Sequence, residues 1–387
     1  MSRKILILCF TLALALPSRA QEFVYTDAAA LPLYGKVCDS TARHFSRLPL
    51  SMKETVRPDV WKLGGDAAGL YVRFCSDAGQ FDFKWTSHRF NNLDNMTAIG
   101  VRGLALYVLD KGEWVYLATA RPSKKGPQNH SKTIEFSDLA GAPREYMLYL
   151  SLYDGVDELE IGVPEGRTLA PSKLDSPRAE KPIIIYGTSI LQGASASHPG
   201  LCGTALLSRR LDRTVVNLGF SGNCLLEAPI AEYMASFPAP GMYVIANWNG
   251  PAQIGRDNLE GVLRTLHGAH PSVPILVVDR SAKPACRFDS KARYEYTSKT
   301  EVVDSVFAIL RAEGVSNLYH CTQNLLGEEN SGTIEGTHYT DEAFRKWADA
   351  VAPVVKEAAP QLCCRKYSAV APTPAFEDVR YAKARAR

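Results

Sequence analysis

The second half of the chain repeatedly alternates short apolar runs with stretches of helical pattern, and this alternation strongly limits its fold. The apolar runs occupy residues 183–186, 215–218, 243–245 and 275–278. Helical patterns cover residues 204–211, 227–236, 258–267 and 299–313. Continuous apolar runs this short are typical of strands buried on both faces of a parallel sheet. We therefore expect residues 182–362 to form a doubly wound, three-layer α/β/α fold with helices on both faces of a parallel sheet.

The first half has a different rhythm, in which apolar and polar residues alternate over short segments. These segments are 69–74, 81–85, 104–109, 114–117, 146–150 and 159–163, with a turn at 110–112. A period of two, many turns and no long helical stretch indicate an antiparallel β-sandwich over residues 21–165. Residues 166–181, rich in Pro, Ser, Glu and Arg, are expected to link the two domains.

Both ends of the chain are expected to lie outside these domains. A basic start, an apolar run at 5–17 and small residues before Gln21 are typical of a secretory signal. The sequence therefore predicts a signal peptide over 1–20, cleaved after Ala20, and export to the periplasm or the extracellular medium. Residues 363–387 carry much of the basic excess and are expected to form a disordered tail.

Charge and cysteine spacing argue against several classes of function. The net charge of +3 is small, and no basic face is visible within the folded part, so we expect no nucleic-acid partner. No segment after the signal is apolar enough to span a membrane. The eight cysteines that follow the signal are scattered and show no zinc-site spacing, so neither a metal, a cofactor nor a definite disulfide is predicted. The oligomeric state stays open.

A serine follows the first apolar run of the second half. Gly187, Thr188 and Ser189 come directly after it, where reactive groups of parallel sheets gather. A hydroxyl beside a helix N-terminus can act as a nucleophile, because the positive end of the helix favours a developing anion. The alternative is that Thr188 or Ser189 only caps this helix.

The next two runs are followed by candidate donors for an oxyanion. The small residues at 219–222 could turn backbone N–H groups towards a cavity, although an ordinary turn would use them too. After the third run, Asn249 or Asn247 could donate a side-chain hydrogen bond, or form a turn before Gly250.

A histidine precedes the last helical pattern, for which Thr340 is the expected N-cap. His338 could accept and return a proton near neutral pH, and Glu335, in a turn with Gly336, could hold its ring. A structural role for this histidine is the alternative. Because all these residues follow strands or begin the last helix, we expect one site to collect them.

The order of these motifs resembles that of the SGNH hydrolases, also called GDSL-type lipases and esterases. Residues 186–189, 217–223 and 336–338 are similar to three of the four family blocks, with Thr188 in place of the family's usual Asp. Residues 55–61 and 69–74 look like the β-sandwich that precedes the hydrolase domain in a bacterial branch of the family.

The resemblance implies a role for each residue. Ser189 would be the nucleophile, His338 the base, and Ser189, Gly222 and Asn249 the oxyanion donors. Two positions depart from the family pattern: Glu335 replaces the usual Asp, and the third block fits Asn249 with Asn247 as the second choice. A backbone carbonyl could orient the histidine in place of Glu335.

We therefore expect a secreted serine esterase that hydrolyses short acyl esters, above all acetyl, on a carbohydrate, with a small molecule or a polysaccharide as the substrate. One alternative is a glycan-binding protein with impaired catalysis, motivated by the two departures. Another is an acyl hydrolase of lipids or thioesters, which would require an extended apolar groove.

Overall fold

The computed structural model describes residues 21–123, 129–322 and 332–362. The expected signal peptide and the expected disordered tail lie outside the described residues.

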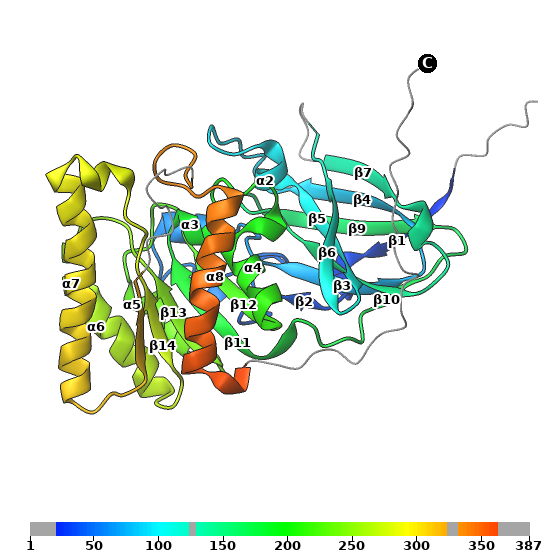
Figure 1. Ribbon diagram of the computed structural model, residues 1–387. Helices are drawn as coiled ribbons and strands as arrows, with labels where there is room; N and C mark the ends of the chain where they lie inside the picture. Colours follow the sequence, from blue (N-terminus) through cyan, green and yellow to red (C-terminus); the bar gives the residue numbers. More distant parts are fainter. Residues whose placement is uncertain (1–20, 124–128, 323–331, 363–387) are drawn as a thin grey trace, which may run out of the picture.

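The first half consists of two antiparallel sheets that enclose an apolar core (Figure 1). One sheet contains, in spatial order, β1 (Phe23–Asp27), β9 (Val156–Pro164), β4 (Gln80–Ser87) and β7 (Asn129–Glu135). The other contains β10 (Leu169–Pro171), β3 (Tyr71–Ser76), β8 (Arg144–Tyr149), β5 (Leu104–Asp110) and β6 (Glu113–Ala120), with β2 (Leu33–Tyr34) also paired to β3. Two short helices, α1 (Pro58–Gly64) and α2 (Ala98–Arg102), connect strands. The predicted β-sandwich is confirmed.

The second half contains a five-stranded parallel sheet. Its spatial order is β12 (Arg213–Gly219), β11 (Arg178–Gly187), β13 (Met242–Ala246), β14 (Ile275–Val278) and β15 (Leu318–Cys321). The helices are α3 (Ser189–Gln192), α4 (Gly203–Leu211), α5 (Ala228–Ala235), α6 (Ala252–Ala269), α7 (Ser290–Ala312) and α8 (Asp341–Ala358). Short 3₁₀ turns complete the chain at η1 (Ala28–Ala30), η2 (Leu50–Met52), η3 (Ser137–Leu139), η4 (Pro199–Leu201), η5 (Pro284–Arg287) and η6 (Pro360–Leu362).

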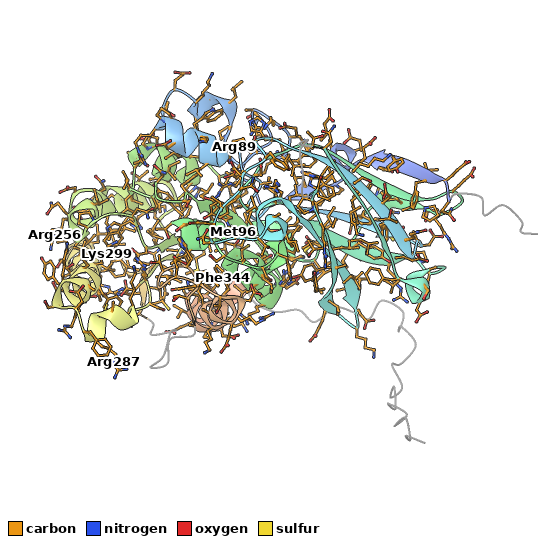
Figure 2. The ribbon with its side chains drawn as sticks, turned by 90° about the horizontal axis from the view of Figure 1, so that it is seen from above. Arg89, Met96, Arg256, Arg287, Lys299 and Phe344 are labelled. Atoms are coloured by element: carbon orange, nitrogen blue, oxygen red, sulfur yellow. The ribbon has the colours of Figure 1, made fainter. Side chains whose placement is uncertain are left out.

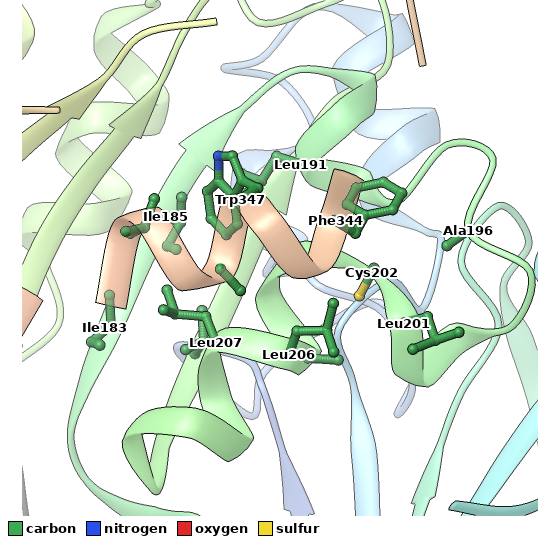
Figure 3. Packing of buried hydrophobic residues seen from close by; sticks show 14 of the residues in the cluster. Ile183, Ile185, Leu191, Ala196, Leu201, Cys202, Leu206, Leu207, Phe344 and Trp347 are labelled. Carbon is green, nitrogen blue, oxygen red and sulfur yellow. The ribbon is translucent and has the colours of Figure 1, made fainter. Parts of the chain in front are cut away.

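Alternate residues of the parallel strands supply two different cores. Ile183 and Ile185 of β11 pack with α4 and α8, whereas Ile184 and Tyr186 pack in the cluster that contains α5, α6 and α7. Figure 3 shows Trp347 of α8 over the first of these faces, near Ile185 and Leu191. Both faces of the sheet are therefore covered, which explains the continuous apolar runs and confirms the doubly wound fold.

Three features differ from the sequence expectation. Helix α7 begins at Ser290, earlier than residue 299, because Asp289 caps it through the Lys291 and Ala292 N–H groups although its first turns carry no apolar stripe. The sequence pattern does not predict strand β15, because its sequence, Leu-Tyr-His-Cys, is not continuously apolar. Residues 166–181, expected to be a linker, include β10 and the start of β11. Strand β10 lies at a sheet edge, where Pro171 is tolerated.

The two halves share one apolar core. Tyr71, Tyr107 and Tyr149 of the sandwich belong to the same buried cluster as Leu206 of α4 and Phe344 of α8. Figure 2 labels Phe344 and Met96, another member of this cluster, where the halves meet.

A buried arginine also joins the halves. The Arg47 guanidinium donates to the carbonyl oxygens of Asn217 and Gly219, each at 2.9 Å, and to those of Asp66 and Leu63 in its own half. The sandwich is thus bonded to the carboxyl end of β12. Among the described residues, no helix has the length and hydropathy needed to cross a membrane.

Candidate active site

Ser189 is the first residue of α3 and follows β11 at the carboxyl edge of the parallel sheet. Gly187 permits this turn, because a Cβ there would lie 2.8 Å from the Ala246 carbonyl oxygen. Thr188 occupies the N-cap position but makes no side-chain capping hydrogen bond. The Ser189 side chain does not cap the helix either, because its hydroxyl lies 2.8 Å from Nε2 of His338.

His338 reaches the serine from a tight turn before α8. Thr333 and Tyr339 form an isolated bridge, the Ile334 N–H donates to the His338 carbonyl, and Gly336 has a φ of +84°. Thr340 then caps α8 by accepting from the Ala343 N–H, as the sequence predicts. This turn brings together two groups that are 149 residues apart in the chain.

Glu335 holds the imidazole from the side opposite the serine. Its Oε1 lies 2.6 Å from Nδ1 of His338 and also accepts from the His338 N–H at 3.2 Å. With the proton on Nδ1, the Nε2 lone pair faces the Ser189 hydroxyl, as a general base requires. The Glu335 side chain is 42% exposed, so water weakens its electrostatic effect on the ring.

Of the expected oxyanion donors, Asn249 lines the cavity that contains Ser189, whereas Gly222 is exposed and does not line it. Two hydrogen bonds nevertheless tie their loops together: Asn249 Oδ1 accepts from the Cys224 N–H at 2.9 Å, and the Asn249 N–H donates to the Cys224 carbonyl at 2.7 Å. Since Oδ1 is engaged, the Asn249 Nδ2 group is left to donate elsewhere.

Asn247 also lines the cavity, but it is held more tightly. It has a φ of +63°, and its Oδ1 accepts from the Trp248 N–H at 2.6 Å and from Lys299 Nζ at 3.3 Å. The choice between the two asparagines therefore remains a proposal, with Asn249 favoured because it fits the family's third block better.

The sandwich contributes a residue that sequence reasoning missed. The side-chain amide of Asn95, in the loop before α2, lies 3.2 Å from Nδ1 of His338. If the Asn95 amide is turned by 180° about its last side-chain bond, its oxygen replaces its nitrogen at this position. The oxygen can then accept a hydrogen bond from the His338 Nδ1–H, as Glu335 does. Nothing in the sequence around Asn95 signals this contact, because it depends on how the two halves pack.

Further contacts from the sandwich support the nucleophile. The Tyr153 hydroxyl donates to the Ser189 carbonyl at 3.2 Å. Gln192 of α3 donates to the buried Asp66 carboxylate at 3.0 Å and accepts from the Ser221 N–H at 3.0 Å. Burial raises the pKa of Asp66 to about 6, although Arg89 and Arg47 oppose the shift.

The cavity beside Ser189 has a volume of about 730 Å³, part of which is open to solvent. Its lining combines aromatic and polar side chains, among them Trp248, Tyr339, Phe344, Trp347, Asn247, Asn249, Asp279 and Arg280. Within the described residues, no three His, Cys, Asp or Glu side chains are grouped so as to hold a metal ion.

Fold and site together define a class. A parallel sheet that presents a serine hydroxyl to a histidine, itself held by a carboxylate, at its carboxyl edge is the arrangement of a serine hydrolase.

Comparisons with known protein families also indicate a hydrolase. The model of the GDSL-like lipase/acylhydrolase family matches residues 180–356, and the GxDLY model, which describes the N-terminus of SGNH-hydrolase-type esterases, matches residues 23–169. A solved structure from Bacteroides ovatus, assigned as a GDSL-like lipase, is 30% identical, with a TM-score of 0.81, over 87% of this chain and 98% of its own. This chain belongs to the GDSL-like, or SGNH, family of lipases and acylhydrolases, and it is a serine ester hydrolase.

More distant structures share the fold. The salicylyl-acyltransferase SsfX3 of a tetracycline biosynthetic pathway is 17% identical with a TM-score of 0.68, over 88% of this chain and all of its own. A family two carbohydrate esterase from Cellvibrio japonicus is 10% identical with a TM-score of 0.56, over 88% of this chain and 99% of its own. No curated protein sequence matches the chain.

Proposed function

We propose that this protein is an exported esterase that removes short acyl groups, above all acetyl, from carbohydrates. The observation that carries the proposal is the 2.8 Å contact between Ser189 Oγ and His338 Nε2 at the wall of a cavity of mixed polar and aromatic lining. The proposal of export rests on the sequence of residues 1–20.

The proposed reaction follows from the positions of these groups. Ser189 Oγ attacks the ester carbonyl while His338 Nε2 takes its proton, and Glu335 stabilises the imidazolium that forms. The Ser189 N–H group and the Asn249 amide donate to the oxyanion. His338 then protonates the departing alcohol, and water, activated by the same imidazole, hydrolyses the acyl-enzyme to release the acid.

Two observations support a short acyl group on a sugar. The cavity carries charged and amide side chains beside its aromatic ones, whereas a long acyl chain requires an extended apolar groove. Structures that share this fold include a carbohydrate esterase from Cellvibrio japonicus and an acetyl xylan esterase from Butyrivibrio proteoclasticus. We also propose that the sandwich domain (21–165) supports the hydrolase domain (182–362) and completes its site through Asn95.

The test measures acetate release from acetylated xylo-oligosaccharides and the turnover of 4-nitrophenyl acetate and palmitate. We expect the acetyl substrates to be preferred, and Ser189→Ala and His338→Ala each to lower kcat by at least about 10³-fold. Unchanged turnover by Ser189→Ala would exclude the mechanism. A preference for palmitate would instead indicate a lipid hydrolase, and ester turnover without any release from acetylated sugars would reject the carbohydrate substrate alone.

A further inference from the structure

A second chamber adjoins the cavity of the catalytic serine. Its volume is about 840 Å³, part of which is open to solvent, and it lies between the loop after β14, the first turns of α7 and the loop after β13. The two spaces share six of their lining residues, which are Asn247, Trp248, Gly250, Asp279, Arg280 and Lys299. One substrate molecule can therefore place its ester at Ser189 and another of its groups in this chamber.

Three cationic side chains line the chamber. Arg280 follows β14, Lys283 directly precedes η5, and Lys299 projects from α7. Lys283 Nζ donates to the Thr337 hydroxyl at 2.9 Å, next to the catalytic histidine. Lys299 Nζ donates to the Trp248 carbonyl at 2.7 Å. Within the described residues, none of the three cations forms an ion pair.

Arg280 lacks even a neutral partner for one of its nitrogen atoms. Its Nη2 is shielded from solvent and donates no hydrogen bond within the described part of the chain. A guanidinium stays charged at any physiological pH, and leaving one of its donors unsatisfied away from water is costly. Such a donor at the wall of a substrate cavity is suited to an acceptor that the substrate brings, and best to an anionic one.

The carboxylates of the chamber do not satisfy this donor. Asp279 Oδ1 lies 3.0 Å from His320 Nε2, and its Oδ2 accepts from the Thr300 hydroxyl at 2.8 Å. Glu295 of α7 also lines the chamber, but it is exposed to solvent and forms no ion pair with the three cations within the described residues. Three cations thus face two carboxylates, one of which is engaged by a histidine. Burial above all, and then the nearby Arg280, lower the pKa of Lys299 to about 8.

We propose that this chamber binds a carboxylate of the substrate, through the Arg280 guanidinium, while the ester carbonyl lies at Ser189. The inference rests on the proposed function and narrows it to esters that carry an acid group. The acid can belong to the alcohol, as in an acetylated uronic acid, or to the acyl group, as in a half-ester of a dicarboxylic acid.

Matched substrates distinguish these two sources. The first pair is O-acetylated methyl glucuronoside against O-acetylated methyl glucoside, and the second is 4-nitrophenyl hydrogen succinate against 4-nitrophenyl butyrate. We expect the acidic member of one pair to have a kcat/KM about 10- to 100-fold higher than its neutral partner, as a charge-assisted hydrogen bond provides. The pair that shows this preference identifies the part of the substrate that carries the acid.

Variants then test the residue. Arg280→Met should reduce the acid-to-neutral ratio of kcat/KM by at least about tenfold, and Arg280→Lys should restore part of it. The matched control is Arg287→Met, which removes an exposed cation at the periphery of the molecule and should leave the ratio unchanged (Figure 2).

Two results would overturn the subsite. The first is that the wild-type enzyme prefers neither acidic substrate over its neutral partner, a result that requires no variant. The other is an Arg280→Met enzyme that keeps the ratio of the wild type. Either result leaves the esterase itself standing if Ser189-dependent turnover of 4-nitrophenyl acetate persists, whereas loss of that dependence would reject the proposed function instead.

Discussion

Glu335 reaches His338 because of the turn between them. Gly336, at a φ of +84°, bends the chain so that one carboxylate oxygen accepts from both the ring and the backbone N–H of His338. The extra methylene of glutamate, compared with the family's usual aspartate, is thus accommodated within the turn. The Glu335 carboxylate is exposed to water, and the Asn95 amide lies near the same nitrogen of the ring. We therefore expect catalysis to depend less on Glu335 than on a buried acid.

We expect Glu335→Gln to lower kcat by about 10- to 10³-fold, less than loss of a buried triad acid, because water and Asn95 still hold the ring. Steady-state kinetics with 4-nitrophenyl acetate measures this. Glu335→Asp, which keeps the charge, is the matched control and should retain more activity than the glutamine variant. A glutamine variant as fast as the wild type would show that the carboxylate has no role in the reaction.

The two asparagines after β13 should respond differently to substitution. Asn249→Ala should lower kcat by about 10²- to 10³-fold with little change in KM, because it removes a donor to the transition state. Asn247→Ala should mainly lower the melting temperature, since Asn247 Oδ1 fixes the Trp248 N–H and Lys299. If the larger kcat effect falls on Asn247 instead, Asn247 is the oxyanion donor.

At the scale of elements, the sequence was sufficient to place most strands and helices and to name the three side chains that the structure brings into contact at the candidate site. Continuous apolar runs in the sequence indicate the buried parallel strands. Ser189, His338 and Glu335 lie in turns whose glycines and positions after strands or before a helix could be read from the sequence. β15 carries His320 among its four residues and gives no such signal. Asn95 and the buried Nη2 of Arg280 could not be predicted, since both depend on which loops meet in three dimensions.

Arg47 links the sandwich to β12, and its loss should weaken the whole assembly. Arg47→Met leaves four carbonyl oxygens without their donor, so we expect the free energy of unfolding to fall by about 3–5 kcal/mol in urea denaturation. The control is Arg264→Met, which breaks exposed ion pairs with Glu260 and Glu313 and should lower stability far less than Arg47→Met. Equal effects of the two substitutions would contradict the role of Arg47.

At the scale of the molecule, the sandwich and the hydrolase domain share a core and a site. Tyr71, Tyr107 and Tyr149 pack in one cluster with α4 and α8, and Asn95 and Tyr153 reach the catalytic residues. Domains joined by a large apolar interface do not move or unfold independently by default. These contacts support the proposal that the sandwich helps to position the site.

This shared core predicts one cooperative unfolding transition. Thermal unfolding followed by far-ultraviolet circular dichroism, by tryptophan fluorescence and by residual esterase activity should give the same midpoint, because unfolding either half exposes the apolar cluster that both halves share. Two separated transitions in calorimetry, with activity lost in only one of them, would show that the halves fold independently.

The most direct test of the whole account is covalent labelling by a fluorophosphonate, followed by mass spectrometry of the digested protein. Because His338 activates the Ser189 hydroxyl, we expect a single adduct on the peptide that contains Ser189. His338→Ala should slow its formation by about 10³-fold or more. An adduct on a different residue, or no adduct on an enzyme that still hydrolyses esters, would contradict the proposed catalytic pair.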